Sequence, residues 1–144
     1  MKLELSVFGD PAPQGSKQAY VRGGKAVLVE SSKKVGPWRK AVKEAAFLLV
    51  GSDFEPLSGP LEIEAVFYLA RPSTVKRALP TVPPDLDKLE RGLWDAVVQA
   101  GLVVDDSLFV RSLSTKLYAD LRAPGVEVTI RSVDFIPLAI ENAA

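Results

Sequence analysis

The order in which strand-like and helix-like segments follow one another restricts the fold of this chain more than any other feature. Four segments alternate between apolar and polar residues, as strands with one buried face do. They are residues 3–8, 61–69, 108–118 and 125–133. Between the first two, the β-rich runs 19–21 and 26–29 flank a pair of glycines, which is typical of a tight hairpin.

Two other segments have helical rather than strand periodicity. One follows Pro37 and runs from Trp38 to about Val50, the other runs from about Asp85 to Ala100, and a glycine ends each. The order of the elements is therefore strand, hairpin, helix, strand, helix, strand and strand. This order predicts an α+β fold in which two main helices pack on a mixed β-sheet.

A length of 144 residues is that of one ordinary domain. We assign residues 1–136 to it and expect residues 137–144 to form a loosely held tail. No apolar run approaches the roughly 20 residues that span a bilayer. The first ten residues lack the basic start and apolar core of a signal peptide, so we expect a cytoplasmic protein.

The chain contains no cysteine and no histidine. These absences exclude disulfides, thiolate zinc sites, cysteine nucleophiles, Ser-His-Asp catalysis and histidine general bases. An enzyme with this composition must use carboxylates, Lys, Arg, Ser, Thr or Tyr. Carboxylates that hold a hard cation such as Mg²⁺ or Mn²⁺ are the natural candidates.

Positive charge is concentrated in two places, although the formal net charge is zero. One cluster consists of Lys33, Lys34, Arg39 and Lys40. The other, Arg71, Lys76 and Arg77, falls in the long proline-rich loop 70–84, and long loops of this kind are often functional. If the acidic residues hold a divalent cation, the formal charge understates the positive field presented to a ligand.

Two aspartates stand where the second helix begins. Asp85 occupies the expected N-cap position and Asp87 lies in the first turn. A structural explanation suffices for each alone, because aspartates cap helices and complement the helix dipole, with about 0.5–2 kcal/mol from a cap. Lys88 and Arg91 lie beside them. Arg91 either forms a surface pair with Asp87 or holds a phosphate. Lys88 lies in the first turn, where a cation opposes the helix dipole, and this suggests a functional reason for it.

A second acidic pair, Asp105–Asp106, follows the apolar segment that leaves this helix. The helix rises about 24 Å over residues 85–100, so its ends are far apart. The pair can reach Asp85 only if the chain doubles back along the helix, which the linking residues permit but do not require. The structural alternative is a solvated turn.

These motifs resemble the signature of the RusA-type Holliday-junction resolvases. The signature contains Asp-Leu-Asp-Asn, a nearby lysine, a helix with Leu/Phe-Asp-Ala and then Asp-Asp before a strand. Its counterparts here are residues 85–91, 94–96 and 101–107. The opening 9–17, with Gly-Asp-Pro-Ala-Pro, is similar to that of many phage members. Residues 116–118 are similar to the Lys-x-Tyr that often follows the acid pair.

The resemblance implies a homodimeric, Mg²⁺-dependent endonuclease that cuts four-way DNA junctions in recombination and repair. Its essential acids carry over to Asp85, Asp87 and Asp106, with Asp105 alongside. The sequence departs from the family at two positions, because the usual asparagine is Lys88 and the usual catalytic lysine falls at Arg91. Arginine keeps the charge but not the capacity to transfer a proton.

We expect DNA phosphates to be held by a set of cations spread along the chain. They are Lys17, Lys33, Lys34, Arg71, Lys76, Arg77 and Lys116. The expected partners are branched DNA and a second copy of the chain, with neither a membrane nor a nucleotide cofactor. Candidate dimer surfaces are Trp94, Val98 and the strands 61–69 and 108–118. The alternatives are a general flap or branched-DNA nuclease, a DNA-binding accessory protein, and a structural protein whose aspartates only cap and turn.

Overall fold

The computed structural model of this chain describes residues 1–14, 17–30 and 33–136, so the expected tail 137–144 lies outside the described residues. Within them the element order matches the expected order, with boundaries that shift by a few residues. The elements are β1 Lys2–Phe8, β2 Lys17–Arg22, β3 Lys25–Glu30, α1 Val35–Val50, β4 Leu61–Leu69, α2 Leu86–Gln99, the 3₁₀ turn η1 Asp106–Leu108, β5 Phe109–Tyr118 and β6 Gly125–Ser132.

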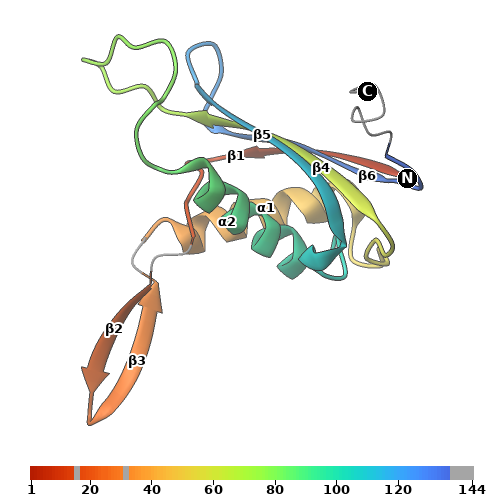
Figure 1. Cartoon of the computed structure of the whole chain (residues 1–144), viewed down its shortest axis with the longest axis horizontal. Helices are drawn as coiled ribbons and strands as arrows, with labels where there is room; N and C mark the ends of the chain where they lie inside the picture. Colours follow the sequence, from red (N-terminus) through yellow and green to blue (C-terminus); the bar gives the residue numbers. More distant parts are fainter. Residues whose placement is uncertain (15–16, 31–32, 137–144) are drawn as a thin grey trace, which may run out of the picture.

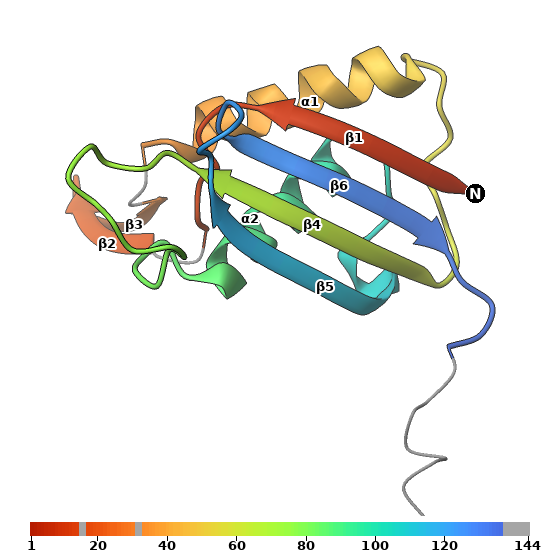
Figure 2. The ribbon, with the colours of Figure 1, turned by 90° about the horizontal axis from the view of Figure 1, so that it is seen from above.

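Four strands form one mixed sheet in the order β1-β6-β4-β5. β4 and β5 are parallel, whereas β6 runs antiparallel to both β1 and β4. The expected α+β fold is thereby confirmed. Both helices lie on one face of this sheet (Figure 1). Figure 2, seen from above, shows the opposite face without a covering helix.

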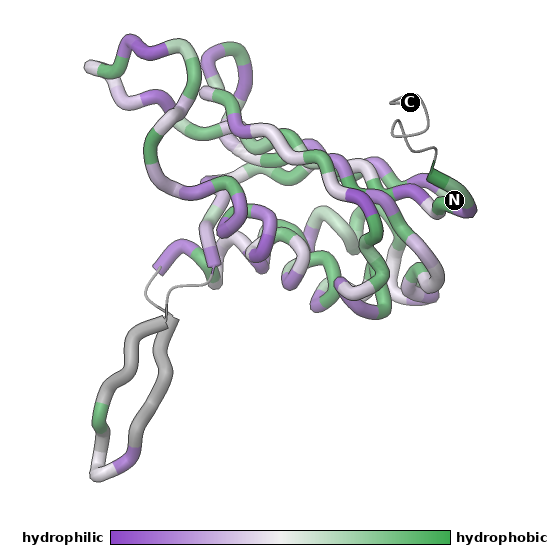
Figure 3. The backbone as a smooth tube through the Cα atoms, in the orientation of Figure 1, coloured by the Kyte–Doolittle hydropathy of each residue, from purple (hydrophilic) through white to green (hydrophobic). Residues whose placement is uncertain are grey.

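The core lies between the sheet and the two helices. In β4, alternate side chains from Leu61 to Phe67 are buried, as the alternating sequence predicts. Trp38 and Val42 of α1 pack against the same cluster, together with Leu89 and other residues of α2. Figure 3 shows hydrophobic and hydrophilic residues alternating along these elements, as expected for elements with one buried face.

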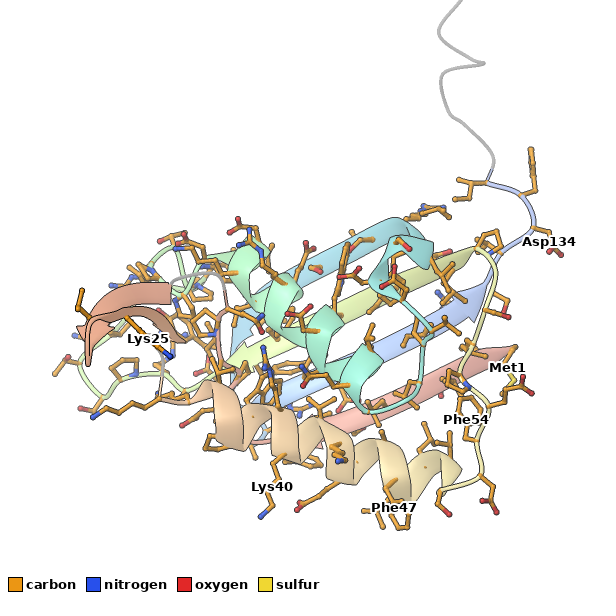
Figure 4. All side chains as sticks on the ribbon, turned by 90° about the horizontal axis from the view of Figure 1, so that it is seen from below. Met1, Lys25, Lys40, Phe47, Phe54 and Asp134 are labelled. Atoms are coloured by element: carbon orange, nitrogen blue, oxygen red, sulfur yellow. The ribbon has the colours of Figure 1, made fainter. Side chains whose placement is uncertain are left out.

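Helix α1 begins earlier than the sequence indicated, at Val35 instead of near Trp38. Pro37 therefore lies inside the first turn, where its missing N–H removes no helical hydrogen bond. Lys40 and Phe47 project from this helix away from the sheet (Figure 4). Within the described residues, no helix is long and apolar enough to cross a membrane.

The hairpin β2–β3 forms a separate two-stranded sheet that projects from one end of the body (Figure 1). The segment that leads into it packs tightly on α2. A Cβ on Gly92 of that helix would lie 2.7 Å from the carbonyl oxygen of Ala12. The N–H of Gln14 donates to the carbonyl of Lys88 over 3.0 Å. Ala12 and Gln14 are therefore held against the first half of α2.

Candidate functional site

The N-terminal end of α2 exposes two carboxylates. Asp85 is the N-cap residue in extended backbone conformation, but its side chain makes no capping hydrogen bond within the described part of the chain. The side chains of Asp85 and Asp87 are 57% and 70% exposed. Asp85 therefore occupies the expected cap position without using its carboxylate as a cap, and this carboxylate is accessible to a ligand.

Both cations predicted beside these acids lie next to them. The Nζ of Lys88 is 3.8 Å from an Oδ of Asp85, and an Nη of Arg91 is 4.0 Å from an Oδ of Asp87. These distances are long for ion pairs, and all the side chains except half-buried Lys88 are exposed, so each pair contributes little to stability. Two acids and two cations thus lie together at the N-terminal end of α2.

The two residues of the second acidic pair, Asp105 and Asp106, have different structural roles. Asp105 caps η1, because its carboxylate accepts a hydrogen bond from the N–H of Ser107 at 3.2 Å and another from the Ser107 hydroxyl. The side-chain bond from Ser107, followed by the backbone bond, lowers the pKa of Asp105 below its usual value. Asp106 is the first residue of η1 and is half-buried. The solvated turn named as the structural alternative for this pair is therefore a short 3₁₀ helix capped by Asp105.

The two acidic groups lie at opposite ends of α2. The helix has 14 residues and is about 21 Å long. The segment before Asp105 is fixed near the start of β4, where Leu57 and Val103 form a bridge. The chain does double back along α2 as strand β5, which is parallel to β4. However, Asp105 and Asp106 both precede β5, so they stay at the C-terminal end of α2. No group of three acidic residues suited to a metal ion occurs in residues 1–14, 17–30 and 33–136.

β5 carries Lys116 back to the loop that precedes Asp85. Its Nζ donates to the carbonyl oxygens of Val82 and Pro84 over 2.8 and 2.9 Å. The contact places a half-buried cation one residue before Asp85. Lys116, which we predicted to bind DNA, therefore holds the turn that leads into α2.

The loop 70–84 is organised around Arg71. Its guanidinium donates to both carboxylate oxygens of Asp120, at 2.7 and 2.9 Å, and lies 4.2 Å from the ring centroid of Tyr118. It also donates to the carbonyl of Arg77 at 2.6 Å, while the Arg77 guanidinium donates to the Tyr118 hydroxyl at 2.7 Å. Of the three cations in this loop that we predicted to bind DNA, Arg71 and Arg77 make contacts that shape the loop, and Lys76 is exposed.

The Arg71–Asp120 pair also shifts the titration of both groups. The hydrogen bond from Arg71 lowers the pKa of Asp120. The same bond raises the pKa of Arg71. Neither Asp120 nor Tyr118 was identified as a contact of this loop from the sequence, because each lies more than 40 positions from its arginine partner.

The remaining predicted cations lie near the base of the hairpin. Lys17 begins β2, but its side chain lies outside the described residues. Lys33 and Lys34 are exposed just before α1, and Lys34 lies 3.9 Å from Asp10. The hairpin, the loop 70–84 and the N-terminal end of α2 occupy the same end of the molecule (Figures 1 and 2).

Gln14 is an important residue that sequence reasoning missed. Its buried side chain accepts a hydrogen bond from Arg39 of α1 and donates one to Asp95 of α2. It therefore links both helices to the segment that enters the hairpin. The available sequence signal was its place in the opening motif 9–17, which carries no information about partners.

Comparison with known proteins identifies the class of enzyme to which this chain belongs. Residues 9–131 match the family model described as endodeoxyribonuclease RusA, which places the chain among DNA-cleaving enzymes. Because the match spans most of the sequence, the chain belongs to the RusA family of endodeoxyribonucleases. An uncharacterised protein of Bacillus subtilis (strain 168), YqaN, is 28% identical over 146 residues. That alignment covers 91% of this chain and 96% of YqaN.

Proposed function

We propose that this protein is a Mg²⁺-dependent endonuclease that resolves four-way DNA junctions by cutting two strands. The proposal rests on Asp85 and Asp87, two exposed carboxylates at the N-terminal end of α2 in a RusA-family domain. Asp85 does not use its carboxylate to cap the helix, and the cations Lys88 and Arg91 lie beside the two acids. The donor chemistry suits the ion, since Mg²⁺ and Mn²⁺ prefer oxygen ligands.

The placement of the acids within one chain does not by itself make a metal site. Asp85 and Asp87 are separated from Asp106 by the length of α2, and no suitable group of three acids occurs in the described residues. We therefore propose that two copies associate with their α2 helices antiparallel. A two-fold axis then brings Asp85 and Asp87 of one subunit to Asp106 of the other, and creates two equivalent sites.

The fold restricts where the second copy can pack. Strand 61–69 is paired on both sides as β4 and offers no free sheet edge to a second copy, so only its outer face stays a candidate dimer surface. Trp94 packs on Phe109 with ring centroids 5.1 Å apart, and Trp94 and Val98 are partly buried against the core. β5 is an edge strand beside α2 that exposes Val110 and Leu113. We propose β5 and the adjacent side of α2 as the dimer surface.

In this mechanism each group has a limited role. A bound Mg²⁺ supplies Lewis-acid activation of water and of the scissile phosphate. Asp85, Asp87 and Asp106 bind that ion, while Asp105 orders the turn that presents Asp106. Lys88 and Arg91 attract the phosphate oxygens and offset the negative charge of the acids. Because arginine stays protonated, Arg91 acts through charge rather than proton transfer.

The first experiment compares cleavage of four-way junction, flap and linear duplex DNA with Mg²⁺ and with EDTA. We expect Mg²⁺-dependent paired cuts on the junction, loss of cleavage in Asp87→Asn, and retained junction binding. Asp53→Asn is the matched control, since Asp53 is also exposed but lies in the segment between α1 and β4, which carries none of the proposed metal ligands. Equal cutting of all three DNAs supports the general nuclease instead, and junction binding without cutting supports the accessory protein.

A mixture of two inactive variants tests the shared site. In a heterodimer of Asp87→Asn and Asp106→Asn subunits, one composite site contains both substitutions and the other contains neither. We expect the mixture to regain nicking of one strand but not paired cutting. If each site belonged to a single chain, every site would carry one substitution and no activity would return. Light scattering that finds a monomer on junction DNA would likewise rule out the dimer.

A further inference from the structure

A cleft of about 440 Å³ opens beside the N-terminal end of α2. Four prolines contribute to its lining: Pro11 and Pro13 from the segment before the hairpin, and Pro83 and Pro84 from the turn before α2. The end of β4 adds Leu69 and Ala70. The lining is therefore mainly apolar and comes from three segments that are distant in the sequence.

Among the described residues, the lining also contains two charged side chains, Asp10 and Lys34, with the Nζ of Lys34 3.9 Å from an Oδ of Asp10. Pro84 directly precedes Asp85, so the cleft lies next to this exposed acid, whose carboxylate is 3.8 Å from the Nζ of Lys88. The cleft therefore combines apolar walls with nearby cations that can bind a phosphate. This combination suits a ligand in which a flat ring system is joined closely to a phosphate. A nucleotide has this combination, because each base is attached through its sugar to a phosphate.

The walls of the cleft are held in place by contacts already described. The bond from the N–H of Gln14 to the carbonyl of Lys88 fixes the segment that carries Pro11 and Pro13 to α2. On the other side, Lys116 donates to the carbonyl of Pro84. Both walls are thus fixed near the acids, and a base in the cleft would have a defined position relative to them.

We propose that this cleft receives one unstacked nucleobase of the DNA strand that is cut, at or beside the branch point. Unstacking costs least where base pairing is already interrupted, and enzymes hold extruded bases between apolar or aromatic side chains. The proposal rests on the proposed endonuclease function. It adds a contact by which the protein would recognise a branch point, because a base displaced from the stack there would bind in the cleft. Lys34 at the cleft would hold the phosphate of the same strand.

The test combines a substitution that fills the cleft with a measurement of the fluorescence of a base analogue in the DNA. Ala70→Leu enlarges an exposed side chain in the lining, and Ala78→Leu makes the same change in the same loop outside the lining. Four-way junctions carry 2-aminopurine beside the branch point, and EDTA prevents cleavage. The described residues of the lining include no aromatic side chain. Wild-type protein and Ala78→Leu should therefore raise the emission as the base leaves the stack, whereas Ala70→Leu should raise it much less.

Binding to a junction with an abasic nucleotide at the same place provides the second measurement. Ala70→Leu should weaken binding of the intact junction roughly tenfold relative to Ala78→Leu, as expected for loss of one base contact. On the abasic junction the two variants should bind equally. Equal emission from both variants, or an equal deficit on the abasic junction, overturns the base pocket. Junction cleavage by the wild type, measured in parallel with Mg²⁺, tests the proposed function separately.

Discussion

Replacing Gly92 by alanine tests the tight contact between α2 and residues 11–14. In an open helical position, Gly→Ala stabilises a protein by about 1 kcal/mol. At Gly92 the new Cβ would lie 2.7 Å from the backbone oxygen of Ala12, which no rotamer change relieves. Overpacking of this kind costs roughly 1–3 kcal/mol. We therefore expect a net loss of about 1 kcal/mol in the free energy of unfolding.

Gly36→Ala provides the matched control. Gly36 lies in the first turn of α1, and a Cβ there would have no heavy atom of the described residues within 4 Å. It should therefore be neutral or stabilising by up to about 1 kcal/mol. The assay is urea unfolding followed by the fluorescence of Trp38 and Trp94, with thermal unfolding in parallel. A loss of 1 kcal/mol corresponds to a melting temperature lower by about 2–5 °C. A Gly92→Ala variant stabilised as much as Gly36→Ala would refute the close contact.

Three further predictions concern charged groups of the site and its supporting loop. Ser107→Ala should raise the pKa of Asp105 toward its ordinary value, and an unchanged NMR titration of that carboxyl would contradict the capping role. The lowered pKa of Asp120 means that its pair with Arg71 stabilises the fold above the ordinary aspartate pKa, about 3.9, and loses this effect as the pH falls through the lowered value. The stability difference between wild type and Asp120→Asn should therefore shrink between pH 6 and pH 3 in urea titrations, and a constant difference would show that the ion pair is not its source. Lys76→Ala should reduce the slope of log affinity against log salt by about 0.9 on duplex arms, whereas an identical slope would remove Lys76 from the DNA interface.

Much of the fold follows from local sequence patterns. Period-two alternation in residues 61–69 identified β4 because one side of that strand faces the core along its whole length. Helical periodicity identified α2, and the two glycines identified the hairpin, because each signal depends only on near neighbours. The start of α1 was missed by three residues, since proline is tolerated at several positions of a first turn.

The sequence also determined the chemistry available to the site. Without histidine or cysteine, only oxygen ligands and permanent cations remain for phosphate chemistry. It correctly paired Arg91 with Asp87, because residues four apart share a helix face, whereas the contact of Lys88 with Asp85 was not predicted. These inferences succeeded for the same reason as the assignment of the strands, namely that the interacting residues are close in the chain.

Tertiary structure alone decided which distant residues meet. The linker after α2 permitted Asp106 to return toward Asp85, but the chain enters β5 only after both acids, so the returning strand brings Lys116 to that end instead. Likewise, Arg71 is paired with Asp120 and Gln14 joins the two helices. Such contacts depend on strand order and register, which the packing of the whole core selects and which no local periodicity encodes.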